Sequence, residues 1–291
     1  MMRYMLRALF FVLLVLPAPL RADVAPGPAM WKLQADGATI TFLGSQHLIP
    51  ASVQWLDSRV TDALNAADSV ALEVDAQKAQ DPAFVQQMMA AGTLPDGQTL
   101  DQVLAPEHFA RLDEICTSLG FPTAGIARYK PWFAGIMLSV IHMQVMGFDP
   151  EAGADSVIDR MARAMGKQMV ALETPEEQLQ ALLSMDALST EELMAEATRE
   201  FDDPNYLVNM LQAWATGNVA AIDTLIQEEL AIYPSVYAAL ITNRNANWVA
   251  PVEQMIRDGG SHFVVVGAAH LIGKDSLIAM LRAKGYQIDR F

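Results

Sequence analysis

The sequence predicts an α/β protein with a central mixed, partly parallel sheet, flanking helices and a largely helical insertion. Short apolar strand patterns alternate with longer patterns of helical spacing along most of the chain. Two of the strand patterns, residues 40–43 and 263–266, lead into the same arrangement, Gly-x-x-His-Leu, at Gly44 to Leu48 and Gly267 to Leu271. Between residues 81 and 150 the patterns are helical, which indicates an insertion.

The first strands are expected to form a hairpin, because residues 30–34 and 39–43 flank an Ala-Asp-Gly-Ala turn sequence. Residues 55–66 have apolar positions at helical spacing, and residues 69–74 form a short apolar run ending in acid. This strand, helix, strand order predicts a parallel pairing between residues 39–43 and 69–74.

The insertion contains helical patterns at residues 81–91, 106–119 and 132–146, separated by glycine and proline. We expect these helices to form a partly separate cap beside the sheet. Tyr129, Trp132 and Phe133 would then either line a substrate groove or belong to a core, and the sequence leaves both interpretations open.

The α/β pattern resumes after Gly153 and extends to the end of the chain. A helix is expected at residues 155–165 and a strand at 168–173, and the helical region at about 175–258 is interrupted by the polar triplet at 243–245. The last elements are strand 263–266, helix 275–283 and strand 286–289. We therefore expect a single domain over residues 23–291.

The charge balance excludes some classes of partner. The chain has 19 basic and 34 acidic residues, which gives a net charge of -15. Nucleic acids and anionic membrane surfaces require a positive footprint, so neither is an expected partner. Cys116 is the sole cysteine, which rules out an internal disulfide, and its helical context favours a buried filler over a nucleophile.

The N-terminus has the three parts of a secretory signal peptide: two arginines before residue 8, an apolar run at residues 8–16, and a breaker segment ending at Ala22. A membrane span needs roughly twenty apolar residues, about twice the length of this run. We expect cleavage near Ala22, a periplasmic product and no stable membrane insertion. The sequence does not indicate the oligomeric state.

Four expected strand ends carry ionisable residues: His47, Glu73, Glu173 and His270. Ligands collect beyond the carboxyl ends of parallel strands, so these side chains are expected to converge. Two imidazoles with carboxylates form a ligand set for zinc, manganese, cobalt or iron and leave a position for water. One Gly-x-x-His is a weak signal, but the matched pair favours one shared site.

These motifs, together with Leu72-Glu73, Gly153-Ala154-Asp155, Leu172-Glu173-Thr174 and Asn243-Arg244-Asn245, resemble the TraB/GumN family, to which the TIKI metalloproteases are related. The resemblance spans nearly the whole mature chain. It implies metal-dependent proteolysis with manganese or cobalt favoured and zinc possible, and with His47, His270 and Glu73 as the metal-binding and catalytic residues. The broader superfamily includes erythromycin-esterase-like hydrolases and heme-binding ChaN-like lipoproteins, so fold alone does not fix the chemistry.

Other candidates have competing structural interpretations. Arg244 is expected to clamp a substrate carboxylate or to stabilise an oxyanion, although a capping or ion-pair role is the alternative. Asn245, Asp155 and Glu173 are expected to bind substrate, although Asp155 and Glu173 also lie where helices start. We expect structural roles for the remaining candidates, which are Ser45, His108, His142 and His262. Ser45 is not in a Gly-x-Ser-x-Gly motif of the kind that presents a nucleophile.

Two classes of function remain open on the sequence. The first is an exported metal-dependent hydrolase, a peptidase in which Glu73 either completes the metal coordination or takes a proton from water. The second is a non-catalytic periplasmic protein that binds a metal, a heme or a peptide. The expected partner of the hydrolase is a peptide or small-molecule substrate.

Overall fold

The computed structural model describes residues 27–203 and 205–291. The expected leader at residues 1–22, and position 204 at the expected start of a helix, lie outside the described residues. A six-stranded sheet with the order β6-β4-β7-β2-β1-β8 forms the centre of the fold. Its strands are β1 (Met30–Ala35), β2 (Ala38–Ser45), β4 (Ser69–Leu72), β6 (Gln168–Ala171), β7 (Gly260–Gly267) and β8 (Ile288–Arg290). A second, two-stranded antiparallel sheet joins β3 (Ile49–Pro50) to β5 (Phe148–Asp149).

The expected hairpin is confirmed. β1 and β2 pair antiparallel, and the turn between them has positive φ at Asp36 (48°) and at Gly37 (81°). A two-residue turn of this kind matches the twist of the flanking strands, which is why Asp-Gly is a strong hairpin signal.

Four strands of the sheet are parallel: β6, β4, β7 and β2. The expected direct pairing of residues 39–43 with 69–74 is wrong, because β7 lies between β2 and β4 and pairs with both. Phe263 to Val266 of β7 are fully or almost fully buried, as a strand covered on both faces should be. The partner of a parallel strand is set by this tertiary burial, which adjacency in the sequence does not report.

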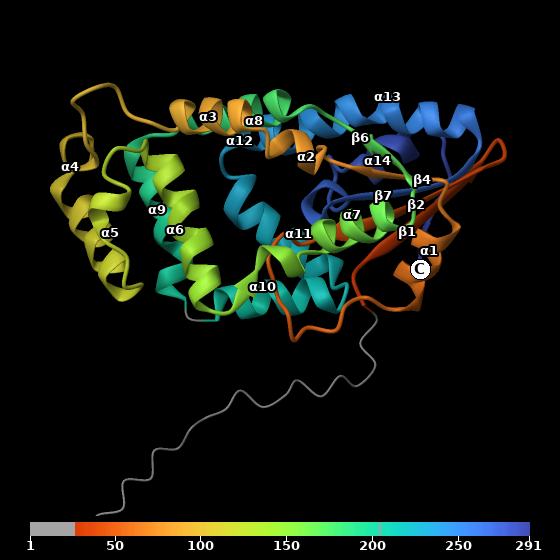
Figure 1. The fold of residues 1–291 in the computed structure, drawn as a ribbon, viewed down its shortest axis with the longest axis horizontal. Helices are drawn as coiled ribbons and strands as arrows, with labels where there is room; N and C mark the ends of the chain where they lie inside the picture. Colours follow the sequence, from red (N-terminus) through yellow and green to blue (C-terminus); the bar gives the residue numbers. More distant parts are fainter. Residues whose placement is uncertain (1–26, 204) are drawn as a thin grey trace, which may run out of the picture.

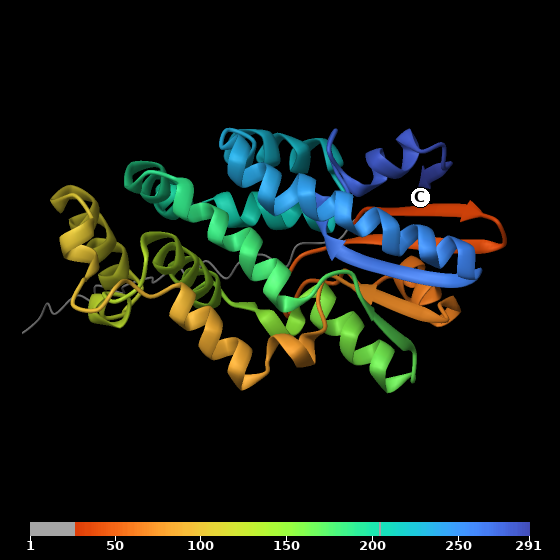
Figure 2. The same cartoon turned by 90° about the horizontal axis from the view of Figure 1, so that it is seen from above.

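Helices cover both faces of the sheet, so the predicted α/β class is confirmed. Figures 1 and 2 show α1 (Ser58–Ala66) and α7 (Ala154–Ala164) on one face and α13 (Asn243–Asp258) and α14 (Leu277–Ala283) on the other. Each face has its own apolar core, one containing Val60 and Ile158 and the other containing Trp248 and Leu277.

Helices from the expected insertion lie to one side of the sheet, together with α9 (Figure 1). α6 packs on α9, and the two share apolar clusters separate from those of the sheet. The helices of residues 76–145 are α2 (Ala76–Ala79), α3 (Pro82–Ala91), α4 (Leu100–Val103), α5 (Pro106–Ser118) and α6 (Pro131–Val145). Those that follow β6 are α8 (Pro175–Leu183), α9 (Thr190–Asp202) and α10 (Tyr206–Ala215).

Two helices are extended by π-helical turns. α11 (Val219–Leu225) continues as η4 (Ile226–Leu230), and α12 (Pro234–Tyr237) continues through η5 (Ala238–Thr242) directly into α13. The expected break at residues 243–245 is therefore wrong, because this triplet is the first turn of α13. Polar composition suggested a loop, but Arg244 and Asn245 bond buried polar groups, whereas Asn243 is exposed.

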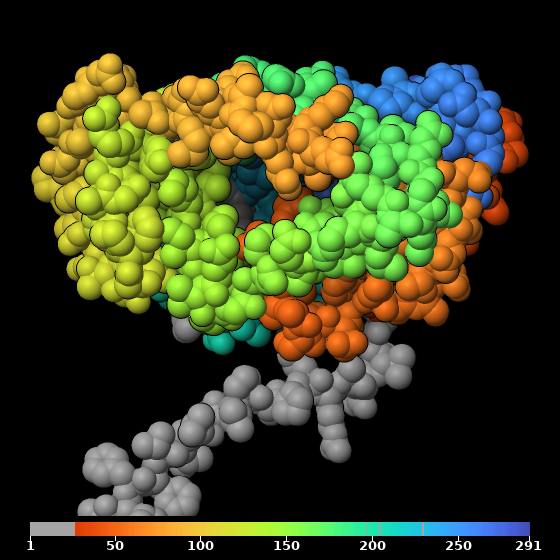
Figure 3. Space-filling model, viewed as in Figure 1, coloured from red at the N-terminus to blue at the C-terminus, as the bar shows by residue number. Residues whose placement is uncertain are grey.

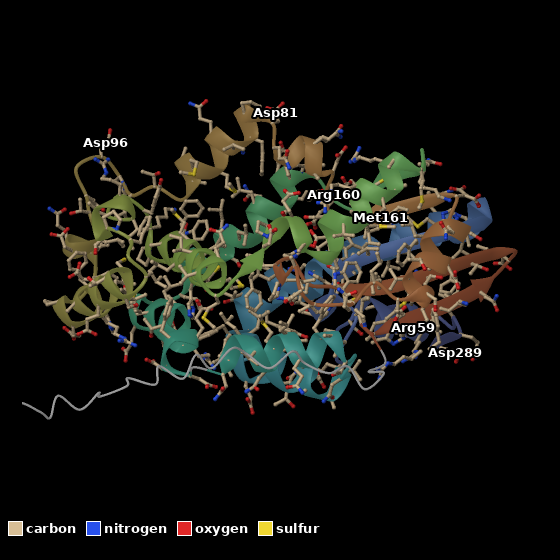
Figure 4. The ribbon with its side chains drawn as sticks, turned by 60° about the horizontal axis from the view of Figure 1, so that its bottom comes forward. Arg59, Asp81, Asp96, Arg160, Met161 and Asp289 are labelled. Carbon is tan, nitrogen blue, oxygen red and sulfur yellow. The ribbon has the colours of Figure 1, made fainter. Side chains whose placement is uncertain are left out.

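Short 3-10 turns complete the described chain: η1 (Thr123–Gly125), η2 (Pro150–Ala152), η3 (Ser184–Ala187) and η6 (Ala268–His270). Within residues 27–203 and 205–291, no helix has the length and apolar character that a membrane crossing requires. Figure 4 marks the extent of the fold, with Asp96 near the end of the helical part and Asp289 near the far end of the sheet.

Candidate functional site

Polar side chains follow each of the four parallel strands at the same edge of the sheet. His47 follows β2, Glu73 follows β4, Glu173 follows β6 and His270 ends the turn after β7. His47, Glu73 and His270 line one cavity of about 530 Å³, together with Arg244 of α13. The carboxyl ends of parallel strands thus bring together side chains that are far apart in the sequence.

The glycine of each Gly-x-x-His motif lies against another part of the site: Gly44 against Ala268 of the second motif, and Gly267 against Glu73. A Cβ atom on Gly44 would lie 3.1 Å from Ala268 Cα, and one on Gly267 would lie 3.2 Å from Glu73 Oε1. Gly267 N–H also donates a hydrogen bond of 2.6 Å to Glu73 Oε1. Close approach explains why both positions are glycine.

The loop carrying His47 is held by backbone contacts. Ala154 N–H donates to Gln46 O at 2.9 Å, and Trp214 Nε1–H donates to Gly44 O at 2.8 Å. A Cβ atom on Gly153 would lie 2.0 Å from His47 O, so only glycine fits there. The start of α7 therefore fixes the position of His47.

His270 is buried, with 4% of its surface exposed, and its tautomer follows from its neighbours. Asn245 Nδ2 donates to Asp275 O at 2.9 Å, so Asn245 Oδ1 is the acceptor for His270 Nδ1–H at 2.8 Å. His270 Nε2 then accepts from Arg244 Nη1 at 3.0 Å. Burial, together with the Arg244 charge, lowers the pKa of His270 to about 4 and keeps the ring neutral.

Arg244 joins two buried glutamates. Its Nη2 lies 2.6 Å from Glu73 Oε2 and 2.6 Å from Glu173 Oε1, and its Nε donates to both Glu173 oxygens at 3.1 and 3.0 Å. Trp248 packs on this group, with its ring 4.5 Å from the His270 ring and 4.9 Å from the guanidinium, and its Nε1–H donates to Glu173 Oε2. We call Glu73, Glu173, Arg244 and His270 the ionic hub.

The two glutamates of the hub have different electrostatics. Burial opposes the charged form of Glu73, but the charges of Arg244 and His47 and the Gly267 N–H outweigh it and hold the pKa of Glu73 below its ordinary value. Burial raises the pKa of Glu173, and Arg244 offsets this only in part. Glu73 is therefore a fixed negative charge facing the cavity.

His47 is more accessible than His270, with 59% of its side chain exposed, and its Nδ1 lies 3.1 Å from Asp155 Oδ1. Partial shielding in the groove works against the charged ring, but the Asp155 and Glu73 carboxylates outweigh it and raise the pKa of His47 to about 9. At neutral pH this histidine is an imidazolium.

The groove around these residues has two chambers, which share Ser45, His47, Glu73 and Gln178. The apolar chamber is the 530 Å³ cavity, lined also by aliphatic side chains of α8, α10, α11, η4 and η5. The polar chamber, of about 410 Å³, is lined also by Glu151, Asp155, Asp159 and Arg160. Figure 3 shows a hollow in this face of the molecule, between α3, α6 and α7, and Figure 4 labels Arg160 on α7.

Of the two interpretations left open for the aromatic residues of the insertion, packing within a core is the one that the structure supports. Trp132 and Phe133 are 2% and 8% exposed and pack with Leu193, and Tyr129 packs edge-on against Phe133. They are absent from the walls of both chambers. These aromatic side chains pack between helices of the helical part of the fold.

The nitrogen and oxygen donors of the site are of the kinds that bind a divalent cation, although other side chains of the protein already bond them. His270 Nδ1 is hydrogen-bonded to Asn245, as the second nitrogen of a metal-ligating histidine usually is to a neighbour, whereas His47 Nδ1 is in ion-pair contact with Asp155. Glu73 Oε1 lies 4.0 Å from His270 Nε2. Arg244 Nη1, however, takes the His270 Nε2 lone pair. In the described part of the chain, no group of three or more His, Cys, Asp or Glu residues stands in metal-binding geometry.

The remaining candidates have structural surroundings. His262 lies near the start of β7, far along the strand from His270, and bonds Ser69 and Gly259. His142 faces Glu200 and stacks on Phe201, and Cys116 is fully buried in α5. Ser45 Oγ is buried without a hydrogen-bond partner among the described residues.

The expected substrate residues occupy three different settings. Asn245 is fully buried and holds His270, Glu173 is held by Arg244 and Trp248, and Asp155 faces the polar chamber. Thr174, rather than Glu173, caps α8. Sequence reasoning missed Trp248, which the four-residue spacing from Arg244 would have placed on the same helix face once residues 243–245 were taken as helical.

Fold and site together define an α/β protein with a buried ionic hub and two histidines at the carboxyl edge of a parallel sheet. A family model described as the TraB/PrgY/gumN family matches residues 29–290, and the chain belongs to this family. Two similar proteins are both described as uncharacterized protein YbaP. The one from Escherichia coli strain K12 is 24% identical over 91% of this chain and 96% of its own length, and the one from Shigella flexneri is 24% identical over 82% and 86%. No solved structure matched.

Proposed function

We propose that this protein is an exported, periplasmic, metal-dependent hydrolase of peptide amide bonds, with His47, His270 and Glu73 as metal ligands. The observation that carries the proposal is that both histidines and Glu73 line one cavity, with Asn245 hydrogen-bonded at His270 Nδ1 and the Asp155 carboxylate 3.1 Å from His47 Nδ1. Such partners orient the ring and leave Nε2 as the ligand atom. When bound, a divalent cation supplies Lewis-acid polarisation of a carbonyl and activates water. Manganese or cobalt is the proposed metal, with zinc as the alternative.

The chain's own residues have separable roles in this proposal. A carboxylate with a lowered pKa is a weak proton acceptor, so Glu73 serves as an anionic ligand rather than as the base. Arg244 keeps Glu73 and Glu173 in place, and its Nη1 is the donor nearest to His270 Nε2. Nη1 would have to leave this nitrogen before the ring bound a cation, and it would then be free to stabilise an oxyanion.

Asn245, Asp155 and Glu173 support the site in different ways. Asn245 sets the His270 tautomer and Asp155 lies at Nδ1 of His47, so both are positioning residues. Asp155 also lines the polar chamber, where it can meet a polar part of a substrate. Glu173 holds Arg244 and lies behind it.

Metal binding by the full mature chain tests the ligand assignment directly. Metal-free protein would be titrated with Co²⁺ and with Mn²⁺ by calorimetry, and Co²⁺ absorption would report the ligand geometry. We expect one site in the wild type and an affinity loss on the order of a hundredfold in His47→Gln and His270→Gln, since each removes one ligand. His262→Gln is the matched control, because it changes a histidine at the other end of β7 and should leave the affinity unchanged.

Turnover is then measured on a peptide library with the metal-loaded chain. Cleavage that requires metal and is lost in Glu73→Gln supports the hydrolase. Metal binding without cleavage supports the non-catalytic binding protein instead, an alternative favoured by the way Arg244 already satisfies the site. Equal metal affinity in the wild type and in a variant lacking both His47 and His270 would overturn both.

A further inference from the structure

The apolar chamber has aliphatic walls that the catalytic residues do not explain. Six half-buried apolar side chains face it from four segments of the chain. They are Leu182, Met210, Ile222, Leu225, Leu230 and Leu240. Partly exposed aliphatic side chains gathered in a concave site lose contact with water when an apolar group fills it, which stabilises the complex.

Two π-helical turns build the wall. η4 carries Ile226 and Leu230, and η5 carries Leu240, four residues before Arg244. π-helical turns are rare and are found frequently at functional sites, because the extra residue redirects the side chains that follow. Both of these turns line the chamber that contains His47, Glu73 and His270.

The polar chamber on the other side of the shared residues has the opposite character. Of the side chains that line it, Glu151, Asp155, Asp159 and Arg160 are charged, in addition to His47 and Glu73. A ligand that crosses the shared residues therefore meets an aliphatic surface on one side and a charged surface on the other. This contrast would favour one orientation of a bound ligand, with its apolar part in the apolar chamber and its polar part in the polar chamber.

We propose that the apolar chamber is a specificity subsite that takes an aliphatic side chain, of the size of leucine or methionine, from the substrate residue next to the bond cleaved. The peptide backbone crosses His47 and Glu73, and its polar remainder lies in the polar chamber. A cavity of about 530 Å³ has the size of a small-ligand site, so it holds a short stretch of peptide rather than a folded partner. This inference rests on the proposed peptide hydrolase.

Binding of two nearly isosteric probes, N-acetyl-leucinamide and N-acetyl-asparaginamide, isolates the apolar contribution without turnover. Ligand-observed NMR on the full chain gives both affinities. We expect the leucine probe to bind roughly tenfold tighter or better, since burying one aliphatic side chain gives a gain of this order. Leu225→Trp fills the chamber and should reduce the preference to less than about threefold.

Thr224→Trp is the matched control, because it introduces the same side chain at the exposed neighbouring position of α11. It should keep the wild-type preference for the leucine probe. Equal binding of both probes to the wild type, or an undiminished preference in a folded Leu225→Trp variant, would overturn the subsite.

The failure of the subsite and the failure of the hydrolase are distinguishable. The leucine preference without peptide cleavage retains the subsite and rejects the hydrolase. Metal-dependent cleavage at equal rates of peptides that differ only by leucine or asparagine next to the bond retains the hydrolase and rejects the subsite.

Discussion

His270 and His47 end equivalent turns, but one lies inside the fold and the other lies in an open groove. Trp248 and Asn245 cover the His270 ring, and its pKa is lowered to about 4. His47 keeps 59% of its side chain exposed beside Asp155, and its pKa is raised to about 9. The same short motif therefore produces a neutral ring in one half of the site and a charged ring in the other, because the covering helices differ.

Removal of Arg244 should produce the largest difference in stability between the His270 half and the His47 half of the site. Arg244→Met leaves Glu73 and Glu173 buried without their counter-charge, so the free energy of unfolding should fall by about 3 to 5 kcal/mol. Arg160→Met is the control on the His47 side, since Arg160 pairs with Glu151 at the surface of α7, where both side chains are more than half exposed, and should cost about 1 kcal/mol or less. Urea unfolding measures both. Similar losses would show that the hub contributes no more than a surface pair.

The pH dependence of stability should differ in sign between the two histidines. Between about pH 6.5 and 4 the unfolded chain binds a proton at residue 270 that the folded chain does not, so His270 makes stability fall as the pH decreases. Between about pH 6.5 and 9 the folded chain holds a proton at residue 47 that the unfolded chain has lost, so His47 makes stability fall as the pH rises through about 9.

NMR titration of the imidazole ring protons gives the two pKa values, and urea unfolding of His270→Gln and His47→Gln across the pH range gives the linked stability. Titration of both rings near the ordinary value of 6.5 would contradict the contrast. Each variant should flatten the pH dependence only in its own range.

Gly153→Ala should disturb the His47 half alone. The new Cβ atom would lie 2.0 Å from His47 O, so the loop must move, at a cost of about 1 to 3 kcal/mol. Gly135→Ala is the control, because its Cβ atom would meet Ala197 in the helical part of the fold instead. The His47 ring resonances should shift in the first variant only. An unchanged His47 spectrum in Gly153→Ala would show that α7 does not position this loop.

Asp155→Asn should have the smallest effect on stability and a clear effect on charge. The partner of an exposed histidine contributes about 1 kcal/mol or less to the free energy of unfolding. Loss of the carboxylate should lower the pKa of His47 from its raised value, whereas the His270 titration stays unchanged. A His47 pKa that does not move in this variant would assign the shift to Glu73.

Local signals in the sequence predicted the elements of the fold well. A few adjacent residues are enough to determine the Asp-Gly turn, the two apolar strands and the Gly-x-x-His turns at their ends. The order of the parallel strands was not predictable in this way, since β7 separates β2 from β4 through contacts made across more than a hundred residues.

The site was predictable in its members and much less so in its connections. The apolar strand patterns identified His47, Glu73 and His270 as strand-end residues. The role of Arg244 as the centre of the ionic hub was not predictable, because it depends on a π-helical turn before Arg244 that polar residues alone would not indicate. The place of Trp132 and Phe133 could not be decided from the sequence, because an apolar helix face can pack within its own part of the fold as readily as it can line a groove.

The contact between Gly44 and Ala268 has an evolutionary consequence. A side chain at residue 44 would press on the backbone of the second motif, at Ala268 Cα, so it could be accommodated only if that turn also moved. The turn cannot move freely, because Gly267 N–H holds Glu73. A substitution at residue 44 should therefore shift the turn of the second motif and disturb the hydrogen bond from Gly267 N–H to Glu73, so each motif constrains which substitutions the other can accept.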